Sequence, residues 1–367
     1  MPAETTGLGA VDWETCALEA RPDPEINRFV RREAGMVPSH LDYYTVCPWV
    51  ARQFAYFALT NIPIHAIPPS LVELLGLVVA QDNSCRYCYA ATRVILRALG
   101  FGDDTVRSLE QGMATSEITP ATRAALDFGR RFSRASPLPG PDALAPLRAH
   151  GFDETAILEI VYVTALSVVA NRIVTLPAVP IADVERMSER RWIRFLQPMA
   201  TLVLRRARRK RYPTALTEPE PARPFAHVVR AFEGHPLGPR LATQVDDAWD
   251  SPILPRRTKA LIVAVVGRAL DCSLSEREAR RLLQLEGVDF DVNDVLAHLA
   301  SPALTEAEGI IVPFVRETVH YDPAPIQRRG RALMARLGQP VFLETIGTAS
   351  LANALCRMGA VLSDPSA

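Results

Sequence analysis

Residues 73–88 read ELLGLVVAQDNSCRYC, and this stretch sets the fold and the chemistry that we expect of the chain. Its apolar segment ends at residues 82–84, whose Asp-Asn-Ser sequence predicts the N-terminal cap of the next helix. Cys85 and Cys88 lie three residues apart, which places both thiols on one side of that helix, close enough to form and break a disulfide. The free N–H groups and the dipole of a first helical turn favour a thiolate, and Arg86 adds a positive charge between the thiols.

Helical periodicity extends over the rest of the chain. Apolar residues recur with the 3.6-residue period in segments that Gly, Pro or Asp separate, and no sustained period-two alternation competes with them. The clearest segments are residues 70–80, 85–99 and 153–176, and Gly100 closes the second of them. The sequence therefore predicts an all-α protein.

Landmarks of the first half return in the second half at a nearly constant spacing. Cys272 and Gly287 follow Cys85 and Gly100 by 187 residues. Thr residues at positions 119 and 305 each precede an amphipathic segment and predict two helix caps, and ANRI at 170–173 corresponds to LCRM at 355–358. We infer a tandem duplication; the alternative is chance similarity between helices rich in Leu, Ala and Arg.

The predicted organisation has four parts. They are a loosely ordered lead-in over 1–24, a first helical domain over 25–180, a basic and Pro-rich linker over 181–224 and a second helical domain over 225–367. Within the linker, an amphipathic helix over 192–204 could run into the basic cluster RRARRKR at 205–211. A solvated helix end is the favoured interpretation of that cluster, and a patch for acidic lipid or nucleic acid is the alternative.

Composition argues against several classes of function. Lys plus Arg number 41, as do Asp plus Glu, so the whole chain has no net charge that would attract nucleic acid or a membrane. Four of the six cysteines are scattered, which is unlike a secreted disulfide framework and favours a reducing cytoplasm. The N-terminal residues do not resemble a secretory signal, and no apolar run of about 18 residues occurs, so we expect no membrane span.

Other roles for the cysteine pair have weaker support. A zinc site would need a second CxxC or a His pair at ligand spacing, and a thioredoxin-type site would need a βαβ pattern around the motif. Two inert cysteines in a helical core are the main remaining alternative, because free cysteine packs as a small apolar residue. We expect neither a metal nor an organic cofactor.

The combination of Glu73 with a CxxC motif that begins twelve residues later resembles the AhpD-like alkylhydroperoxidase and carboxymuconolactone decarboxylase superfamily. The resemblance covers most of residues 25–180 and, more weakly, 225–362. It implies an all-helical fold that assembles into homo-oligomers. It also implies that Cys88 attacks a peroxide, that Cys85 closes the disulfide and exchanges with an external dithiol, and that Glu73 belongs to a proton relay.

One position departs from the family pattern. Redox members of the family carry a His four residues after the second Cys, where this chain has Thr92. Thr92 can hydrogen-bond, but it is no base near neutral pH, so we expect slow peroxidase turnover or a different reaction. Tyr87 and Tyr89 flank Cys88, and either could donate a proton in part compensation.

The second copy lacks most of these groups. Cys272 keeps the position of the first thiol, but Ser275 stands at the second, Ala279 at the His position and Ala260 at the Glu position. No disulfide can form within that motif, so we expect the C-terminal half to be a structural partner.

The sequence thus favours a cytoplasmic thiol–disulfide oxidoreductase of AhpD-like type, with Cys85, Cys88, Glu73 and Thr92 at its site. Its substrate would be a hydroperoxide or another small organic molecule. The alternatives are a non-catalytic or redox-sensing oligomeric scaffold and a decarboxylase-type enzyme for a small organic acid. A lowered pKa of the Cys88 thiol is expected for catalysis, and a value near the ordinary one of about 8.5 for a scaffold.

Overall fold

The computed structural model describes residues 8–102, 104–106, 118–207, 210–216 and 223–363. The other residues lie outside it; they include 1–7 of the predicted lead-in and 208–209 and 217–222 of the predicted linker. Every regular element in the described residues is a helix and none is a strand, which confirms the all-α class.

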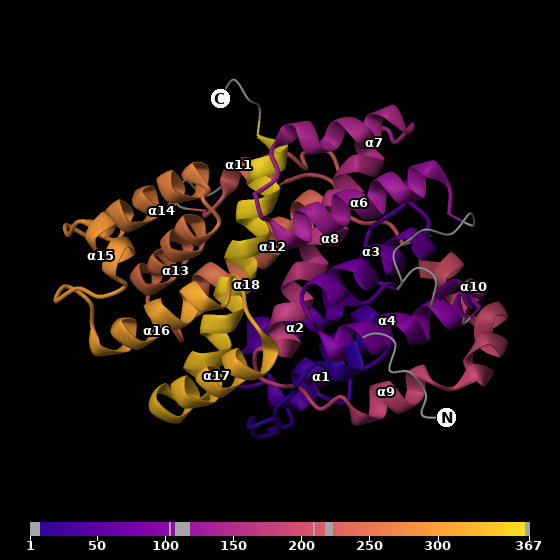
Figure 1. Ribbon diagram of the computed structural model, residues 1–367, viewed down its shortest axis with the longest axis horizontal. Helices are drawn as coiled ribbons and strands as arrows, with labels where there is room; N and C mark the ends of the chain where they lie inside the picture. The colour runs from indigo at the N-terminus through magenta and orange to yellow at the C-terminus, as the bar shows by residue number, and fades with distance from the viewer. Residues whose placement is uncertain (1–7, 103, 107–117, 208–209, 217–222, 364–367) are drawn as a thin grey trace.

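The helices of each half follow one another in a similar order, and we call the halves the first and the second repeat. The first repeat contains α1 (Pro24–Ala34), α2 (Pro48–Phe57), α3 (Pro69–Asp82), α4 (Arg86–Ala98), α6 (Pro120–Arg134), α7 (Ala145–Ala149) and α8 (Glu154–Thr175). The second repeat contains α11 (Ala226–Arg230), α12 (Leu237–Asp250), α13 (Arg256–Ala269), α14 (Ser273–Leu285), α15 (Val292–His298), α16 (Glu306–Glu317), α17 (Pro323–Leu337) and α18 (Gln339–Leu362). In Figure 1, α3, α4 and α6 lie on one side of the molecule and α13, α14 and α16 on the other, with α18 between them.

The repeats share the turns that position their helices. Ser84 and Asp271 both adopt the left-handed backbone conformation, with φ of 49° and 54°, just before the cysteine that opens α4 or α14. The side chains of Thr119 and Thr305 cap α6 and α16, as predicted. Because these turns keep a spacing of 186 or 187 residues, they confirm two helical repeats in tandem.

Helices α8 and α18 pack against each other in the middle of the molecule. By length and composition α8 could cross a membrane, but 83% of its apolar window is buried inside the protein. Helices α3 and α6 cover it from its own repeat, and α18 covers it from the other. Its apolar composition is therefore that of a core helix.

Each of these long helices sends one buried arginine into the other repeat. Arg172 on α8 donates a hydrogen bond to the carbonyl oxygen of Val319, just beyond α16, at 3.0 Å. Arg357 on α18 donates to the carbonyl oxygens of Phe132 and Ser133 near the end of α6. Ser133 and Val319 lie 186 residues apart, at equivalent positions, so the exchange is reciprocal. Each repeat thus supplies acceptors that a buried guanidinium of the other requires.

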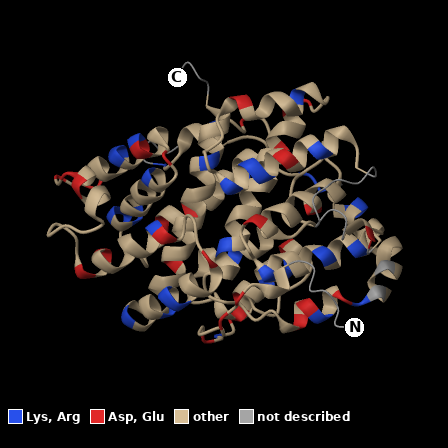
Figure 2. Ribbon diagram, in the orientation of Figure 1, with Lys and Arg blue, Asp and Glu red and all other residues tan. Residues whose placement is uncertain are grey.

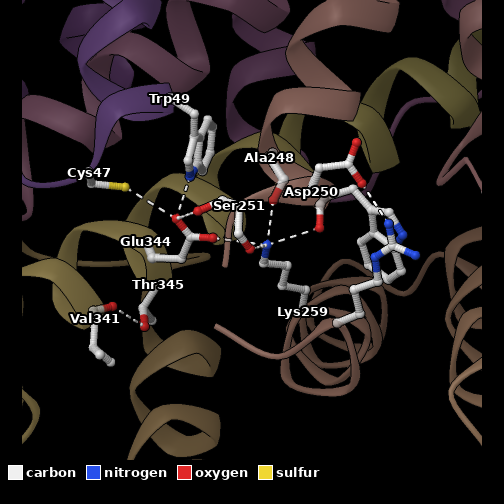
Figure 3. Close-up of polar contacts among 11 residues, drawn as sticks. Cys47, Trp49, Ala248, Asp250, Ser251, Lys259, Val341, Glu344 and Thr345 are labelled. Atoms are coloured by element: carbon white, nitrogen blue, oxygen red, sulfur yellow. Dashed lines mark hydrogen bonds and ion pairs between the residues drawn. The ribbon is translucent and has the colours of Figure 1, made fainter. Parts of the chain in front are cut away.

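A buried glutamate on each long helix also contacts a residue of the other repeat. Glu344 on α18 forms an ion pair with Lys259 of α13 at 3.0 Å and accepts a hydrogen bond from the Cys47 thiol of the first repeat at 3.2 Å (Figure 3). Its counterpart Glu159 on α8 lies 3.6 Å from the ring of His235 in the second repeat. Cys47 and His235 each precede a proline at the start of α2 or α12, so this exchange is also reciprocal.

The described residues of the lead-in, which we predicted to be loosely ordered, and the first part of the predicted linker are both held against the protein. In the lead-in, the indole of Trp13 donates to the carbonyl oxygen of Val179 at 3.1 Å, and a backbone N–H bonds to α17. In the predicted linker, α9 (Ala182–Ser188), the 3-10 helix η4 (Arg191–Leu196) and α10 (Gln197–Ala207) all pack against α4. The first part of that linker is therefore a helical layer on the first repeat, because apolar residues such as Ile193 are buried against it.

Candidate redox site

A cavity of about 660 Å³ opens beside the CxxC motif. Its walls come from α2, α3, α4, α8 and α9 and from the residues around the short helix η2 (Leu41–Tyr43). Most of its lining side chains are apolar, among them Phe54, Ile95 and Leu166. Its polar side chains include those of Ser39, His40, Glu73, Tyr87, Cys88, Thr92, Ser167 and Asn171. Three of the four predicted site residues thus face one cavity, and Cys85 is the exception.

Cys85 lies behind Cys88 and does not line the cavity. Its side chain is fully buried and its sulfur accepts the N–H of Cys88 at 3.3 Å, so Cys85 itself caps α4. The predicted cap at 82–84 is therefore wrong, because Asn83 ends α3 and Ser84 takes the left-handed turn. Cys88 is half-buried and lines the cavity, and both thiols are reduced. One thiol faces the cavity and the other is hidden next to it.

The Cys88 thiol is not activated in this reduced state. Burial raises its pKa well above the ordinary value, and the adjacent Cys85 raises it further. Arg86, which we expected to lower this pKa, instead forms an ion pair with Glu185 on α9 at 2.9 Å and donates to the carbonyl oxygen of Val11 at 3.1 Å. The predicted thiolate at the helix start is therefore wrong for the resting protein, because desolvation outweighs the N-terminal position.

Glu73 is a buried carboxyl group without a protein partner. It is 9% exposed, it lines the cavity, and it makes no hydrogen bond or ion pair with the residues that the structure describes. Burial raises its pKa to about 8, so it is mainly protonated at neutral pH. A titratable group that is shifted by desolvation and faces a cavity is typical of a functional site. It can donate a proton below pH 8 and accept one above.

Thr92 occupies the family His position and also faces the cavity. Helix α3 comes close to it at Gly76, where a β-carbon would lie 3.5 Å from Thr92 Oγ1 and 3.9 Å from Ser167 Oγ. Glycine at this position therefore leaves space beside the two hydroxyl groups. Both can hydrogen-bond to a molecule in the cavity, but neither is a base near neutral pH.

His40 is the residue of this site that the sequence did not indicate. It precedes η2, lines the cavity and is 5% exposed. Its Nδ1 lies 3.0 Å from the hydroxyl oxygen of Tyr87, and its Nε2 is buried with no hydrogen-bond partner among the described residues. Burial lowers its pKa to about 4, so the ring is neutral at physiological pH. No spacing rule links His40 to the motif, since only the packing of the α1–α2 connection against α4 brings them together.

The equivalent site in the second repeat is filled. Cys272 and Ser275 approach each other to 3.1 Å between sulfur and oxygen. Ser275, Ala279 and Ala260 are fully buried, so none of the replacements for Cys88, Thr92 and Glu73 reaches solvent. In the described part of the chain, no group of three His, Cys, Asp or Glu side chains gathers as metal ligands would.

Comparisons with known proteins gave matches among solved structures. No protein-family model matches the chain, and no curated protein matches it. An uncharacterized peroxidase-related protein from Silicibacter sp. TM1040 is 25% identical, with a TM-score of 0.39, over 49% of this chain and 98% of its own. A peroxidase-related protein from Ralstonia eutropha JMP134, described as an alkylhydroperoxidase AhpD core, is 24% identical, with a TM-score of 0.40, over 46% and 92%.

A third solved structure is the debrominase Bmp8 in complex with 2,3,4-tribromopyrrole. It is 17% identical, with a TM-score of 0.41, over 48% of this chain and 97% of its own. Each of the three proteins therefore matches about half of this chain and nearly all of itself. Two of the three are described as peroxidase-related proteins.

Proposed function

We propose that this protein is a thiol–disulfide oxidoreductase of AhpD-like type that reduces an apolar hydroperoxide. Cys88 would be the attacking thiol and Cys85 the resolving thiol. One observation carries the proposal: Cys88 and the unpartnered carboxyl group of Glu73 line the same cavity, and Cys85 lies directly behind Cys88. A nucleophile, a titratable acid and a second thiol are the groups that such a cycle needs.

The proposed cycle begins when the Cys88 thiolate attacks the outer oxygen of the hydroperoxide. The O–O bond breaks, Cys88 becomes a sulfenic acid, and the alkoxide that leaves takes up one proton to become an alcohol. The Cys85 sulfur then displaces the sulfenic hydroxyl, which leaves as water with the Cys85 proton, and a disulfide forms. An external dithiol reduces this disulfide by thiol exchange and is itself oxidised.

Two groups in the cavity could move these protons. Ionised Glu73 can accept the Cys88 proton, directly or through a water molecule. Tyr87 can donate a proton to the departing alkoxide, while its hydrogen bond with neutral His40 holds the hydroxyl group in place. In this assignment His40 is a positioning residue, and the pair takes over the role that Thr92 cannot fill.

The cavity favours a larger apolar substrate over hydrogen peroxide. Its volume of about 660 Å³ lies within the range of sites for drug-sized ligands, and its lining is mainly apolar. An alkyl or aryl hydroperoxide could place its carbon body against these walls and its polar group near Cys88. A small organic acid fits less well, because no Lys or Arg stands among the lining residues that the structure describes.

Peptide mass spectrometry tests the proposed pair. Trypsin cleaves after Arg86, so Cys85 and Cys88 fall in the separate peptides 53–86 and 87–93, each of which has no other cysteine. After one equivalent of cumene hydroperoxide we expect these two peptides to be joined by a disulfide, and dithiothreitol should separate them. The peptides that carry Cys272 and Cys356 provide the internal control and should stay unlinked. Consumption of the hydroperoxide without the 53–86 to 87–93 link would reject the Cys85/Cys88 pair.

A redox-sensing helical scaffold is the second candidate function, and the raised pKa of Cys88 favours it. A sensor would be oxidised once and would change its assembly or its contacts, whereas an enzyme would turn over. Continuous consumption of cumene hydroperoxide with excess dithiothreitol supports the enzyme, and a single equivalent supports the sensor. A reducing cytoplasm would supply the dithiol in either case, which fits six free cysteines.

A further inference from the structure

A row of large apolar side chains lies exposed on the outer layer of the first repeat. We call it the α10 stripe and define it as Trp192, Phe195, Met199, Leu202 and Val203. These side chains are 46% to 72% exposed, and α10 has no buried residue. Met199, Leu202 and Val203 lie on one face of α10, and Trp192 and Phe195 belong to η4, which directly precedes α10 and packs against it, so the five form an exposed apolar surface. Figure 1 shows α10 at the edge of the molecule, beyond α4.

The same segment has a strongly basic sequence. Residues 190–211 contain nine Arg or Lys residues and no Asp or Glu, although the whole chain is neutral. Arg205 and Arg206 lie in the last turn of α10, and Lys210 and Arg211 follow. In the rest of the molecule, acidic and basic residues are interspersed, as Figure 2 shows. Among the basic side chains that the structure describes, those of Arg205 and Arg206 share α10 with the apolar stripe, so positive charge and apolar surface meet on this helix.

We propose that the α10 stripe docks on an anionic lipid bilayer. The apolar side chains would enter the boundary between headgroups and acyl chains, where Trp192 suits the interface, and the basic residues would pair with lipid phosphates. This mode of binding requires both features that the segment combines. The helix would lie on the membrane surface and would not cross it.

Two other occupants fit the segment less well. Nucleic acid would pair with the basic residues but would leave five large apolar side chains exposed to water. A second copy of this chain, packed through the same surface about a two-fold axis, would bring two positively charged segments together. An anionic bilayer satisfies the apolar and the basic residues together.

The proposed membrane surface and the cavity are joined by α9, which lines the cavity and precedes η4 and α10 in the chain. Helix α9, η4 and α10 follow one another along α4, and all three pack against it. Met187 on α9 lines the cavity and is 46% exposed, and it precedes Trp192 by five residues. Docking would therefore place the apolar cavity close to the bilayer. The docking itself does not depend on the redox chemistry proposed above.

Vesicle sedimentation of the full chain tests this inference. We expect the protein to pellet with phosphatidylcholine vesicles that contain about 30% phosphatidylglycerol and to stay in solution with pure phosphatidylcholine. Leu202→Glu should weaken pelleting about tenfold or more, because it places a charge in the stripe. The matched control is Leu285→Glu on α14 of the second repeat, where the leucine is 56% exposed against 53% for Leu202. That control should pellet like the unchanged protein.

Three results would overturn the proposal. The first is equal loss of pelleting in both leucine variants, and the second is binding that does not depend on the anionic lipid. The third is a change of sedimentation coefficient without lipid in Leu202→Glu but not in Leu285→Glu, which would assign the stripe to a subunit interface. Far-ultraviolet circular dichroism of both variants shows whether they are folded, and Phe195→Ser replaces Leu202→Glu if that variant is not. Hydroperoxide turnover is measured separately, so loss of docking is distinguishable from loss of chemistry.

Discussion

The first repeat and the second repeat share the backbone turn that precedes the motif helix, but they differ in the side chains around it. Both place a cysteine after a left-handed residue at the start of a helix, and each exchanges a buried arginine and a buried glutamate contact with the other. Side chains at corresponding positions of the two repeats nevertheless differ in size. Gly76, Tyr87 and Ala170 line the cavity, whereas the second repeat has Val263, Leu274 and Leu355. Long helices and their mutual contacts therefore keep the frame, while the cavity and the candidate site depend on a few side chains that differ between the repeats.

The largest expected effect distinguishes Cys88 of the first repeat from Cys272 of the second repeat. Cys88→Ser should lower hydroperoxide turnover by at least about a thousandfold, because an alcohol cannot replace the sulfur nucleophile. Cys272→Ser in the second repeat should leave the turnover unchanged, since that sulfur is buried in a filled site. A steady-state assay with cumene hydroperoxide and dithiothreitol measures both variants. Similar rates in the two variants would remove the basis for assigning the chemistry to the first repeat.

The next effect concerns the two buried glutamates, Glu344 and Glu159. Lys259→Met should cost about 3–5 kcal/mol of unfolding free energy, because it leaves Glu344 buried without the cation from its own repeat. His235→Leu removes the contact of Glu159 with the second repeat and should cost only about 1 kcal/mol. Glu159 keeps its hydrogen bonds from the backbone N–H groups of residues 65–67. Urea unfolding measures both losses, and a larger loss for His235→Leu would contradict this ranking.

Glu73→Gln should lower turnover by about a hundredfold and remove its dependence on pH near 8. In the unchanged protein the rate should rise from pH 7 to pH 9, because Glu73, with a pKa of about 8, becomes able to accept the Cys88 proton. Rates from pH 6 to pH 9.5 measure this rise. Glu286→Gln, which replaces an exposed carboxylate at the end of α14 in the second repeat, is the control for loss of a carboxylate, and it should keep the rise.

Glu73→Gln should also stabilise the fold, and increasingly so as the pH rises from 5 to 8. The pKa of Glu73 is about 8 in the folded state, against an ordinary value of 4.5, so folding favours the protonated carboxyl group. Stability from this group is therefore complete below pH 4.5 and is lost as the pH rises to 8, by up to about 5 kcal/mol. Urea unfolding of Glu73→Gln should show an advantage over the unchanged protein that grows from pH 5 to pH 8. An advantage that shrinks over this range would show that Glu73 is ionised and paired.

The smallest expected effect distinguishes the two tyrosines beside Cys88. Tyr87→Phe should lower turnover about tenfold, because it removes the hydroxyl group that His40 holds at the cavity. Tyr89→Phe should have little effect, since Tyr89 does not line the cavity. The loss in Tyr87→Phe should be larger for tert-butyl hydroperoxide than for cumene hydroperoxide, whose alkoxide is a better leaving group. A larger loss in Tyr89→Phe would exclude the proposed role of the His40–Tyr87 pair.

Within the candidate site, some residues could be predicted from the sequence and others could not. Cys88, Glu73 and Thr92 meet at the cavity as expected, because helix periodicity fixes which residues share a face. Arg86 failed as an activating charge because its partner, Glu185, comes from a segment about a hundred residues later that we took for a linker. His40 was missed because its contact with Tyr87 joins two segments that no local pattern relates.

The amino-acid sequence by itself determined the helical class and the duplication, and it indicated the candidate groups of the site. These follow from local features, namely apolar periodicity, helix caps and residue spacing, which a short stretch of chain carries within itself. Only the tertiary structure decided the environment of each group: which thiol is hidden, where the charge of Arg86 is directed, and how far burial shifts the pKa of Glu73 and Cys88. The physical reason is that desolvation and partner contacts depend on residues distant in sequence, which only the packed chain brings together.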